Sequence, residues 1–464
     1  MRVFGFHLRS QLVALAGAEA LLFFVAPFVA VHLRFHGTFL DIKEKLPSLW
    51  PQGLLFAAVM MISLLAMGLY SSRQRASIQG VLVRTVASGV AAFIVLGLLY
   101  YMLPSMFLGR GLLLLMVIVG VLGSAAGRLV ARRVIDDRIF KRRVLVYGVG
   151  DQAFHISRLR RRSDQRGFVV VGYVPGSCDS VTVPEEQIIK STGTLFDICR
   201  ECRVEEIVVA MDDRRRSFPV QELLECRLRD IDVIDVLSFL ERETGKVRVE
   251  VLTPSWMIFG SGFSRSGPRQ FTARALDVLA SLALLAISWP VMLLTALAIK
   301  IEDGVRAPVF YSQTRVGLEG RTFQLLKFRS MRVDAEKEGK AIWAEKQDRR
   351  VTRVGSATRA IRLDELPQIF NVLAGDMRFV GPRPERPEFV ESLCARIPYY
   401  RELHIVKPGI TGWAQLCYPY GSSEQDAIEK LQYDLYYVKN HSLIFDLSIL
   451  AQTIEVILWR KGAR

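Results

Sequence analysis

Cysteine and histidine are scarce in this chain, which has six of each among its 464 residues. Cys199 and Cys202 have the spacing of a metal or redox motif, but no second pair accompanies them. The six histidines form no recognisable ligand cluster. The sequence therefore indicates neither a metal centre built from these residue types nor a disulfide framework, and reduced thiols are the default.

The chain also lacks a recognisable nucleic-acid-binding module, although it is strongly basic. Its 61 lysines and arginines exceed its 46 aspartates and glutamates, which gives a net charge of +15. Such a balance suits either nucleic acid or an anionic membrane surface. Because 51% of the residues are hydrophobic and many of them gather in long runs, the sequence favours membrane lipid over a nucleic-acid partner.

Four apolar runs fill the first third of the chain, and each approaches the length of about 20 residues that a spanning helix needs. They cover residues 12–31, 53–70, 85–102 and 111–127. The first run is too long for a signal peptide and lacks its cleavage pattern. Its Glu19 is costly in hydrocarbon, so we expect it to face another helix as a packed polar contact rather than to relay protons. The runs predict a transmembrane domain over residues 1–140.

Basic residues predict the orientation of these helices. Seven lysines and arginines lie between residues 128 and 143, three lie between residues 73 and 84, and two precede the first run. The two intervening loops carry fewer positive charges. Cytoplasmic loops are enriched in lysine and arginine, so both ends of the four-helix unit are expected in the cytoplasm.

The character of the chain changes near residue 141, where strand-like runs alternate with helical stretches. The strand-like runs cover residues 144–147, 168–174, 207–210 and 233–236. This alternation predicts a Rossmann-like α/β domain over residues 141–250, with a parallel sheet covered by helices. A loop at residues 148–153 fits a dinucleotide-binding pattern, but the second strand ends without the expected ribose-binding acid. A domain without nucleotide, with a structural or regulatory role, is therefore favoured over an occupied one.

Two adjacent carboxylates, Asp364 and Glu365, stand in a segment that is otherwise rich in arginine. Nearby positive charge keeps such groups ionised, so they can act as a nucleophile or as ligands for Mg²⁺. Arginine grips phosphate with two parallel donors. Because Pro367 is tolerated only near a helix start, the pair is predicted in the first turn of a helix. The pattern points to chemistry at phosphorus, although mixed charge around a short helix is also typical of a solvated face.

Several longer motifs accompany this pair in a fixed order. They cover residues 298–301, 308–317, 327–331, 348–355, 363–368, 371–373, 375–377, 380–385 and 407–415. From about residue 271 to the C-terminus, the chain resembles the bacterial sugar transferases that move a hexose 1-phosphate from a nucleotide sugar to a polyprenyl phosphate. The resemblance includes the large form of this family, which has N-terminal membrane helices and a Rossmann-like domain.

The resemblance implies roles for individual residues. Asp364 matches the nucleophile that attacks the β-phosphate of the donor and forms a phosphosugar–enzyme intermediate, which polyprenyl phosphate then intercepts. Glu365 matches its partner, a metal ligand or an orienting base. Arg359 and Arg383 match arginines that contact phosphate, and the alternative for each is a surface ion pair.

Four further residues are weaker candidates. Lys327 and Arg329 lie in a basic and aromatic stretch that is expected to help hold the donor phosphates, with a surface ion pair as the equal alternative. Asp434 and Asp446 are candidates for metal or structural contacts.

A fifth apolar run over residues 278–299 follows a linker at 251–270 and contains Pro290. Its length alone predicts another spanning helix. A true span would place the rest of the chain outside the cytoplasm, away from nucleotide sugars, and proline in a helix interior causes a kink. The resembled family has a re-entrant helix with a serine–proline pair at its bend, whereas Trp289 precedes the proline here. The sequence predicts a re-entrant helix over about residues 275–301, bent at Pro290.

These features predict three parts: a membrane α-helical bundle of four spanning helices, a Rossmann-like α/β domain, and a mixed, mainly α catalytic domain over residues 271–464 with the re-entrant helix. The resemblance implies a multi-pass enzyme of the bacterial inner membrane with its catalytic domain in the cytoplasm. We expect it to transfer a sugar 1-phosphate from a nucleotide diphosphate-sugar, a UDP-hexose, to undecaprenyl phosphate, with release of nucleotide monophosphate, as the first membrane step of exopolysaccharide biosynthesis. Mg²⁺ is the expected cofactor, and homodimer formation is left open.

Two other functions remain open. A nucleotide-sugar dehydratase or epimerase with NAD at the Gly148 loop would carry a tyrosine–lysine pair beyond the loop, and none is recognisable in the Rossmann-like region. A non-catalytic membrane scaffold for polysaccharide assembly would leave the arginine and carboxylate pattern without a purpose.

Overall fold

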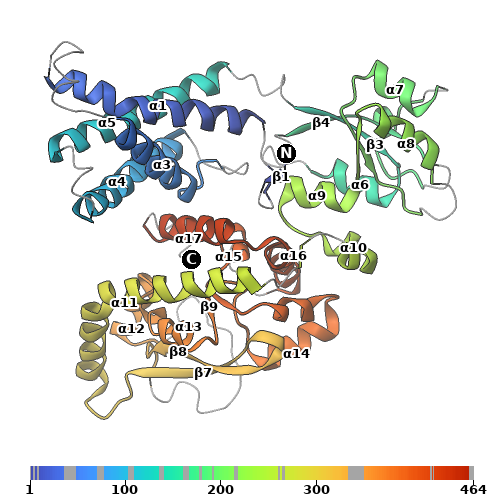
Figure 1. Ribbon diagram of the computed structural model, residues 1–464. Coiled ribbons are helices and arrows are strands. Elements are labelled where there is room, and N and C mark those ends of the chain that lie inside the picture. Colours follow the sequence, from blue (N-terminus) through green and yellow to red (C-terminus); the bar gives the residue numbers. More distant parts are fainter. Residues whose placement is uncertain are drawn as a thin grey trace. The chain divides into compact units, whose positions relative to one another are not determined.

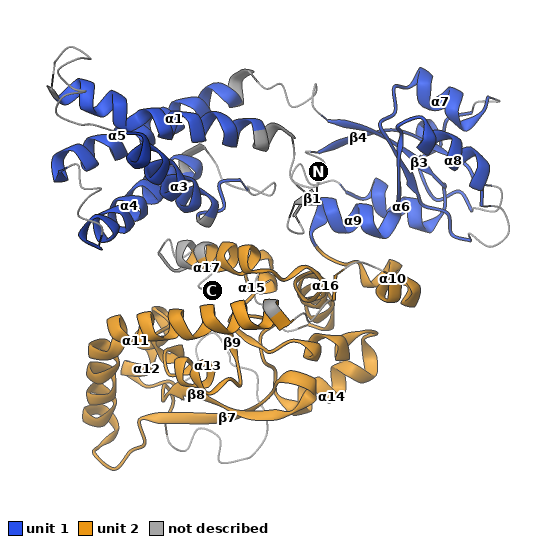
Figure 2. Cartoon of the chain, in the orientation of Figure 1, with its two compact units in different colours: residues 1–245 blue, residues 246–464 orange. Residues whose placement is uncertain are grey.

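The computed structural model describes residues 2–3, 6–7, 10–35, 49–70, 78–102, 109–134, 141–159, 167–176, 180–190, 193–213, 218–259, 262–263, 267–332, 350–418, 421 and 423–458. The chain divides into two compact units, residues 1–245 and 246–464 (Figures 1 and 2). The finer division predicted from the sequence, with boundaries near residues 140, 250 and 270, stays a prediction.

The first unit contains a bundle of apolar helices, preceded by a short hairpin of β1 (Arg2–Val3) and β2 (Phe6–His7). The helices are α1 (Ser10–Phe35), α3 (Trp50–Ala66), α4 (Ile78–Met102) and α5 (Arg110–Val134). They coincide with the four predicted runs. α1, α4 and α5 are long and apolar enough to cross a membrane, and α3 is a shorter apolar helix of 17 residues.

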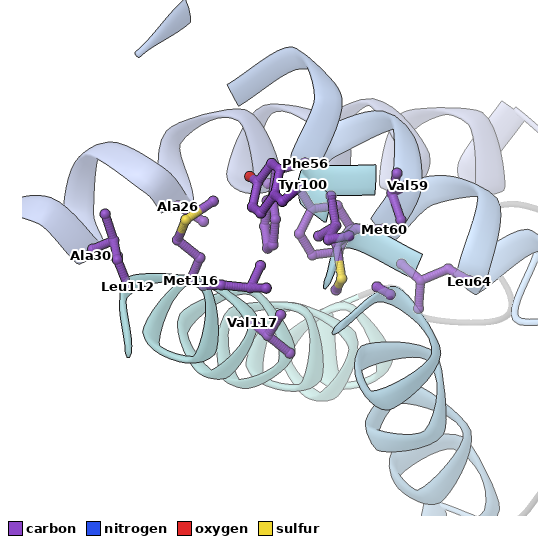
Figure 3. Close-up of a cluster of buried hydrophobic side chains, with 14 of the residues drawn as sticks. Ala26, Ala30, Phe56, Val59, Met60, Leu64, Tyr100, Leu112, Met116 and Val117 are labelled. Atoms are coloured by element: carbon purple, nitrogen blue, oxygen red, sulfur yellow. The ribbon is translucent and has the colours of Figure 1, made fainter. Parts of the chain in front are cut away.

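The bundle is apolar both inside and outside. Its interior is packed with side chains such as Phe56, Met60 and Met116 (Figure 3). Large aliphatic side chains are also exposed on its surface, Leu98 and Leu122 among them. A helix that is apolar all round belongs either in a protein core or in a membrane, and these exposed faces fit the second case.

One buried polar cluster interrupts the apolar interior. Glu19 on α1 accepts hydrogen bonds from Ser124 at 2.6 Å and from Arg128 at 2.7 Å, both on α5, and also from the hydroxyl of Tyr70. Arg128 donates in addition to the carbonyl of Leu69 at 3.2 Å. Buried charges are tolerated when they are paired and hydrogen-bonded in this way. The prediction that Glu19 faces another helix as a packed polar contact is confirmed.

The rest of the first unit is an α/β fold. Its sheet is parallel, in the order β4-β3-β5-β6. The strands are β3 (Arg142–Tyr147), β4 (Phe168–Val174), β5 (Glu206–Val209) and β6 (Asp232–Asp235). The connecting elements are α6 (Asp151–Ser157), η2 (Glu185–Gln187), α7 (Leu195–Glu201), α8 (Val220–Leu228) and α9 (Val236–Thr244). The predicted parallel sheet with its connecting helices is confirmed, and the strands match the predicted ranges to within two residues.

The second unit is mainly helical and has two small sheets. β7 (Phe310–Val316) and β8 (Thr322–Phe328) form an antiparallel hairpin, while β9 (Arg378–Val380) and β10 (Gly409–Thr411) pair in parallel. The helices are α10 (Pro254–Phe259), α11 (Gly267–Asp303), α12 (Arg353–Ala360), α13 (Gln368–Ala374), α14 (Pro387–Arg396), α15 (Trp413–Cys417), α16 (Glu424–Asn440) and α17 (Leu443–Leu458). Short 3-10 turns lie at η3 (Val249–Val251), η4 (Leu318–Gly320), η5 (Leu363–Glu365) and η6 (Tyr400–Ile405).

The long helix α11 contains the fifth apolar run. It has 37 residues, with Pro290 in its interior, and Figure 1 shows it changing direction partway along its length. We attribute this change to Pro290, because proline removes a helical hydrogen bond and clashes with the preceding turn. Apolar side chains such as Ile287 and Leu293 are exposed along the helix. By length and composition α11 is the fourth helix able to cross a membrane among the described residues.

Candidate active site

The two adjacent carboxylates lie in η5, which connects α12 to α13. The prediction that they occupy the first turn of an α-helix is wrong in detail. Pro367 has no N–H to donate, so the chain closes a separate 3-10 turn, with a bond from the Leu366 N–H to the Leu363 carbonyl at 3.1 Å, and α13 begins only at Gln368. Arg362 enters this turn in the left-handed region, at φ 57°. This conformation is uncommon for a residue other than glycine.

Glu365 is held between two cations. Its Oε1 accepts hydrogen bonds from Lys327 Nζ at 3.2 Å and from Arg383 at 3.3 Å. Burial alone raises the pKa of this carboxyl, but Arg383 and then Lys327 outweigh it and lower the pKa to about 2. Glu365 is therefore ionised at neutral pH.

Asp364 has a different environment, although it is the next residue. It is only 9% exposed, and it makes no ion pair with another described residue. Burial raises its pKa, Lys327 and Arg359 act against that rise, and Glu365 adds to it. A carboxylate with a raised pKa is more basic and therefore a stronger nucleophile when it is ionised. The arrangement thus separates a firmly paired carboxylate from one that stays available to attack a substrate.

The cations around the pair come from several elements. Lys327 lies on β8, Arg359 lies in the last turn of α12, and Arg383 lies between two prolines after β9. Arg359 Nε donates to the hydroxyl of Ser330 at 2.9 Å, which fixes its direction. The structure therefore brings together three of the four predicted phosphate-binding residues.

Arg329 is the fourth of these residues, and no contact places it at the carboxylate pair. Its backbone N–H bonds to the Val309 carbonyl at 2.9 Å, and its Nε is buried without a hydrogen-bond partner among the described residues. Its role in holding the donor stays a prediction.

A buried asparagine, the first residue of the motif at 371–373, stabilises this site. Asn371 on α13 is 4% exposed. Its Oδ1 accepts the Leu326 N–H at 3.0 Å and its Nδ2 donates to the Gln324 carbonyl at 2.7 Å. These bonds replace a strand partner along β8 and hold Lys327, the next residue, within reach of Glu365. The motif includes this asparagine, but its role was not predicted, because its partners lie more than 40 positions away.

Asp446 lies in a separate buried network. It accepts hydrogen bonds from Arg378 at 2.7 Å and from Tyr437 at 2.8 Å. Arg378 also donates to Asp277 on α11 at 3.2 Å, and Asp277 accepts the Phe379 N–H at 3.0 Å. These are structural contacts that join α11, β9, α16 and α17.

Asp434 is buried on α16, and burial together with the negative charge of Glu385 raises its pKa to about 8. Such a carboxyl is largely protonated at neutral pH and is then a poor ligand for a hard cation. Its predicted metal role is not supported by any group of neighbouring ligands.

Among the described residues, no group of three or more His, Cys, Asp or Glu side chains could hold a metal ion. Mg²⁺, however, usually takes only one or two carboxylates and completes its shell with water and substrate phosphate. Asp364 and Glu365 fit that requirement, because they are adjacent carboxylates beside the cationic side chains of Lys327, Arg359 and Arg383.

In the loop at residues 148–153 of the α/β fold, backbone N–H groups are bound by the side chain of Asp212. Asp212 accepts the backbone N–H groups of Asp151 and Gln152, each at 3.0 Å, at the start of α6. A Cβ at Gly150 would lie 1.8 Å from the Asp212 carboxylate, so glycine is needed for this approach. The N–H groups that a dinucleotide phosphate would use are thus already paired. Whether the loop binds a nucleotide stays a prediction.

Comparisons with known proteins cover both halves of the chain. Residues 268–460 match the family model described as bacterial sugar transferase, and residues 65–225 match the one described as CoA-binding domain. A UDP-N-acetylgalactosamine-undecaprenyl-phosphate N-acetylgalactosaminephosphotransferase of Aeromonas hydrophila is 42% identical over 242 residues, 52% of this chain and 56% of the relative.

Two further relatives are named UDP-glucose:undecaprenyl-phosphate glucose-1-phosphate transferase. The protein of Xanthomonas campestris is 33% identical over 337 residues, 69% of this chain and 67% of the relative. The protein of Klebsiella pneumoniae is 33% identical over 323 residues, 68% of this chain and 67% of the relative. The chain thus spans little more than half of the first relative and two thirds of these two.

Proposed function

Since the chain belongs to the bacterial sugar transferase family, we propose that it transfers a sugar 1-phosphate from a UDP-sugar to undecaprenyl phosphate and releases UMP. The observation that carries this proposal is the pair of unlike carboxylates, with Glu365 fixed by Lys327 and Arg383 and with Asp364 left unpaired among the described residues. A nucleophile beside phosphate-binding cations is what phosphoryl transfer requires.

The proposed reaction has two steps at one phosphorus atom. An oxygen of Asp364 forms a bond to the β-phosphorus of the donor, and the bond from that phosphorus to the bridging oxygen breaks, so that UMP departs with the electron pair. A phosphate oxygen of undecaprenyl phosphate then attacks the same phosphorus and releases the Asp364 carboxylate. Atoms and charge balance without an oxidant or a reductant.

The neighbouring residues stabilise charge during both steps. Arg359 and Arg383 are placed to bind the phosphoryl oxygens, where charge develops. Lys327 balances the charge of Glu365 and lies close enough to Asp364 to oppose the rise of its pKa. When bound at Asp364 and Glu365, Mg²⁺ screens the charge of the diphosphate.

The proposal includes a location. We place the protein in the inner membrane, with the catalytic domain in the cytoplasm, where the nucleotide sugars are. The bend of α11 supports a helix that enters the membrane and returns to the same side, and the basic residues after α5 support a cytoplasmic end of the bundle. Undecaprenyl phosphate, a membrane lipid, would then meet the site at the membrane surface, and the reaction would begin the assembly of an exported polysaccharide.

The decisive experiment is a product analysis. Membranes that contain the full chain are incubated with undecaprenyl phosphate and a panel of radiolabelled UDP-sugars, including UDP-glucose and UDP-N-acetylgalactosamine. We expect label to enter the lipid from one of these donors and UMP to be released in equal amount. Release of UDP as the primary product would refute the phosphosugar mechanism, and membranes with Asp364→Asn serve as the matched control.

The two alternatives are less well supported. The NAD-dependent reading needs free N–H groups at the Gly148 loop, and Asp212 pairs those of Asp151 and Gln152. A non-catalytic scaffold gives no reason for a carboxylate pair, with Asp364 buried, surrounded by Lys327, Arg359 and Arg383.

A further inference from the structure

The helix α11 contacts the two helices on either side of the catalytic turn. Contacts occur between α11 and α12, which precedes η5, and between α11 and α13, which follows it. α11 forms hydrogen bonds with the N-terminal end of α12 and with the C-terminal end of α13. Both of these ends point away from η5. η5 therefore connects two short helices, α12 and α13, whose other ends are both bound to α11.

Arg274 holds the far end of α13. Its guanidinium donates to the carbonyl oxygens of Val372 at 2.6 Å and Leu373 at 2.7 Å. These carbonyls belong to the last turn of α13, where helical partners are missing and the partial charge is negative. A cation with two fixed donors matches that end in both charge and geometry.

Glu302 binds the N-terminal end of α12, and it accepts hydrogen bonds where Arg274 donates them. Its two carboxylate oxygens accept the N–H groups of Arg353 at 2.7 Å and Val354 at 2.8 Å, in the first turn of α12. That end has unpaired donors and a positive partial charge.

The two residues stand on opposite sides of the bend. Arg274 precedes Pro290 and Glu302 follows it, so the angle of α11 determines where the far ends of α13 and α12 lie. α12 has eight residues and is about 12 Å long, with Arg359 in its last turn. Because α12 is short and moves as a rigid body, a displacement at Glu302 also displaces Arg359, which lies beside Asp364.

We propose that Arg274 and Glu302 are positioning residues through which the bent helix α11 sets the placement of Asp364 relative to Arg359. The proposal rests on the proposed phosphosugar transfer at Asp364. Neither residue touches the reacting atoms. Each acts through the short helix whose end it contacts, so the chemical step depends on the shape of α11.

The test measures the first chemical step separately from donor binding. Full-length protein in lipid nanodiscs receives a UDP-sugar labelled in the sugar and no lipid acceptor, and the rate of label transfer to Asp364 is followed by rapid quenching. The KM for the donor comes from steady-state assays with undecaprenyl phosphate. The variants are Glu302→Gln, Arg274→Met, the double variant and Arg274→Lys, and thermal unfolding of each is recorded.

We expect Glu302→Gln and Arg274→Met each to slow label transfer about tenfold, since small misplacements of reacting groups have large effects on rate. The KM should stay within about twofold. Both residues act on the placement of Asp364 relative to Arg359. The rate loss in the double variant should therefore be smaller than the product of the two single losses. Arg274→Lys should recover only part of the rate, because an ammonium group keeps the charge but not the two fixed donors.

Asp303→Asn is the matched control for Glu302→Gln. Asp303 is the next carboxylate on α11, and it has no hydrogen bond or ion pair in the part of the chain that the structure describes. Its neutralisation changes the charge equally and should leave the rate unchanged. Glu302 is exposed, so its variant should fold even if Arg274→Met does not.

Three results would overturn the positioning role: unchanged label transfer in Glu302→Gln, an equal loss in Asp303→Asn, or effects that multiply in the double variant. Failure of the proposed function looks different. In that case wild-type protein itself would take up no label on Asp364, or would release UDP, and the positioning role would fall with it.

Discussion

Arg383 donates to Oε1 of Glu365 at 3.3 Å, although 18 positions separate the two residues in the chain. The contact orients an arginine that would otherwise have many conformations. Glu365 thus orients the guanidinium of Arg383, which we propose to bind phosphate. Glu365 orients a cation and Asp364 is the proposed nucleophile, so substitutions around the two residues should have different effects.

Asp364→Asn should abolish turnover without unfolding the protein. Asparagine has nearly the same shape as aspartate, but its amide is neutral and a poor nucleophile. We expect loss of both UMP release and label uptake, with a thermal unfolding midpoint equal to or above that of the wild type, since burial raises the pKa of the native carboxyl. Substantial activity in this variant would assign Asp364 to a structural role.

Arg383→Lys should lower kcat/KM by much more than the conserved charge suggests. Lysine is a point charge and cannot grip a phosphate with two parallel donors. It also cannot keep the bond to Glu365 and bind substrate in the same geometry. We expect a loss of about 10- to 100-fold, in line with the loss of a charge-assisted bidentate contact of about 1.5–3 kcal/mol. Measurement of kcat/KM for the UDP-sugar checks this, with Arg306→Lys, outside the site, as the control.

The pH dependence of stability should reveal Asp434. Its pKa is raised from its ordinary 3.8 to about 8, so the folded state binds the proton more tightly than the unfolded state. The stability that this contributes is complete below pH 3.8 and is lost as the pH rises through about 8. Asp434→Asn carries no such charge, so its unfolding midpoint should exceed that of the wild type increasingly between about pH 4 and pH 8, with a constant difference at higher pH.

The same variant tests the other role considered for Asp434. A residue that supplied an oxygen to Mg²⁺ would lose activity when changed to asparagine, whereas a protonated structural carboxyl would not. Retained activity together with a smaller pH dependence would support the structural role. A pH-independent difference in unfolding midpoint would contradict the raised pKa.

The direction of α11 can be tested by labelling from defined sides of the membrane. Cysteines introduced by Gly267→Cys and Val305→Cys, one at each end of α11, are expected to react from the cytoplasmic side in both cases. Both positions are exposed. A background in which the six native cysteines are replaced gives the control, together with a cysteine placed in the loop between α1 and α3. Labelling of the two ends from opposite sides would show that α11 spans the membrane and would contradict the proposed location of the site.

The sequence predicted the elements that local patterns specify. Apolar runs gave the helices of the bundle, and alternating strand and helix signals gave the parallel sheet, because each pattern reflects the burial of a face within one element. The motifs around Asp364 also identified the family. Arg359 and Arg383 were identified through the family resemblance, and Lys327 was a weaker candidate from its basic and aromatic stretch.

The contacts between distant residues could not be predicted in this way. Asn371, Asp212, Arg274 and Glu302 are polar residues whose partners are backbone groups elsewhere in the chain, and no spacing rule marks them. The 3-10 turn at η5 was missed for a related reason. Its form depends on the absent N–H of Pro367 and on the unusual conformation of Arg362, whose positive φ cannot be recognised from residue type.

The pair formed by Glu19 and Arg128 has a consequence for the order in which the bundle is assembled. Glu19 belongs to its first helix and Arg128 to its last. An unpaired charge in a membrane helix costs up to about 3 kcal/mol on insertion scales, and less toward the helix ends, and neither residue can pair with the other until both helices are inserted. The first helix must therefore keep its charge solvated at the membrane surface, or bear that cost, throughout synthesis of the next two. Completion of the bundle is thus coupled to the arrival of α5, and a chain that ends before α5 is expected to leave its first helix poorly inserted.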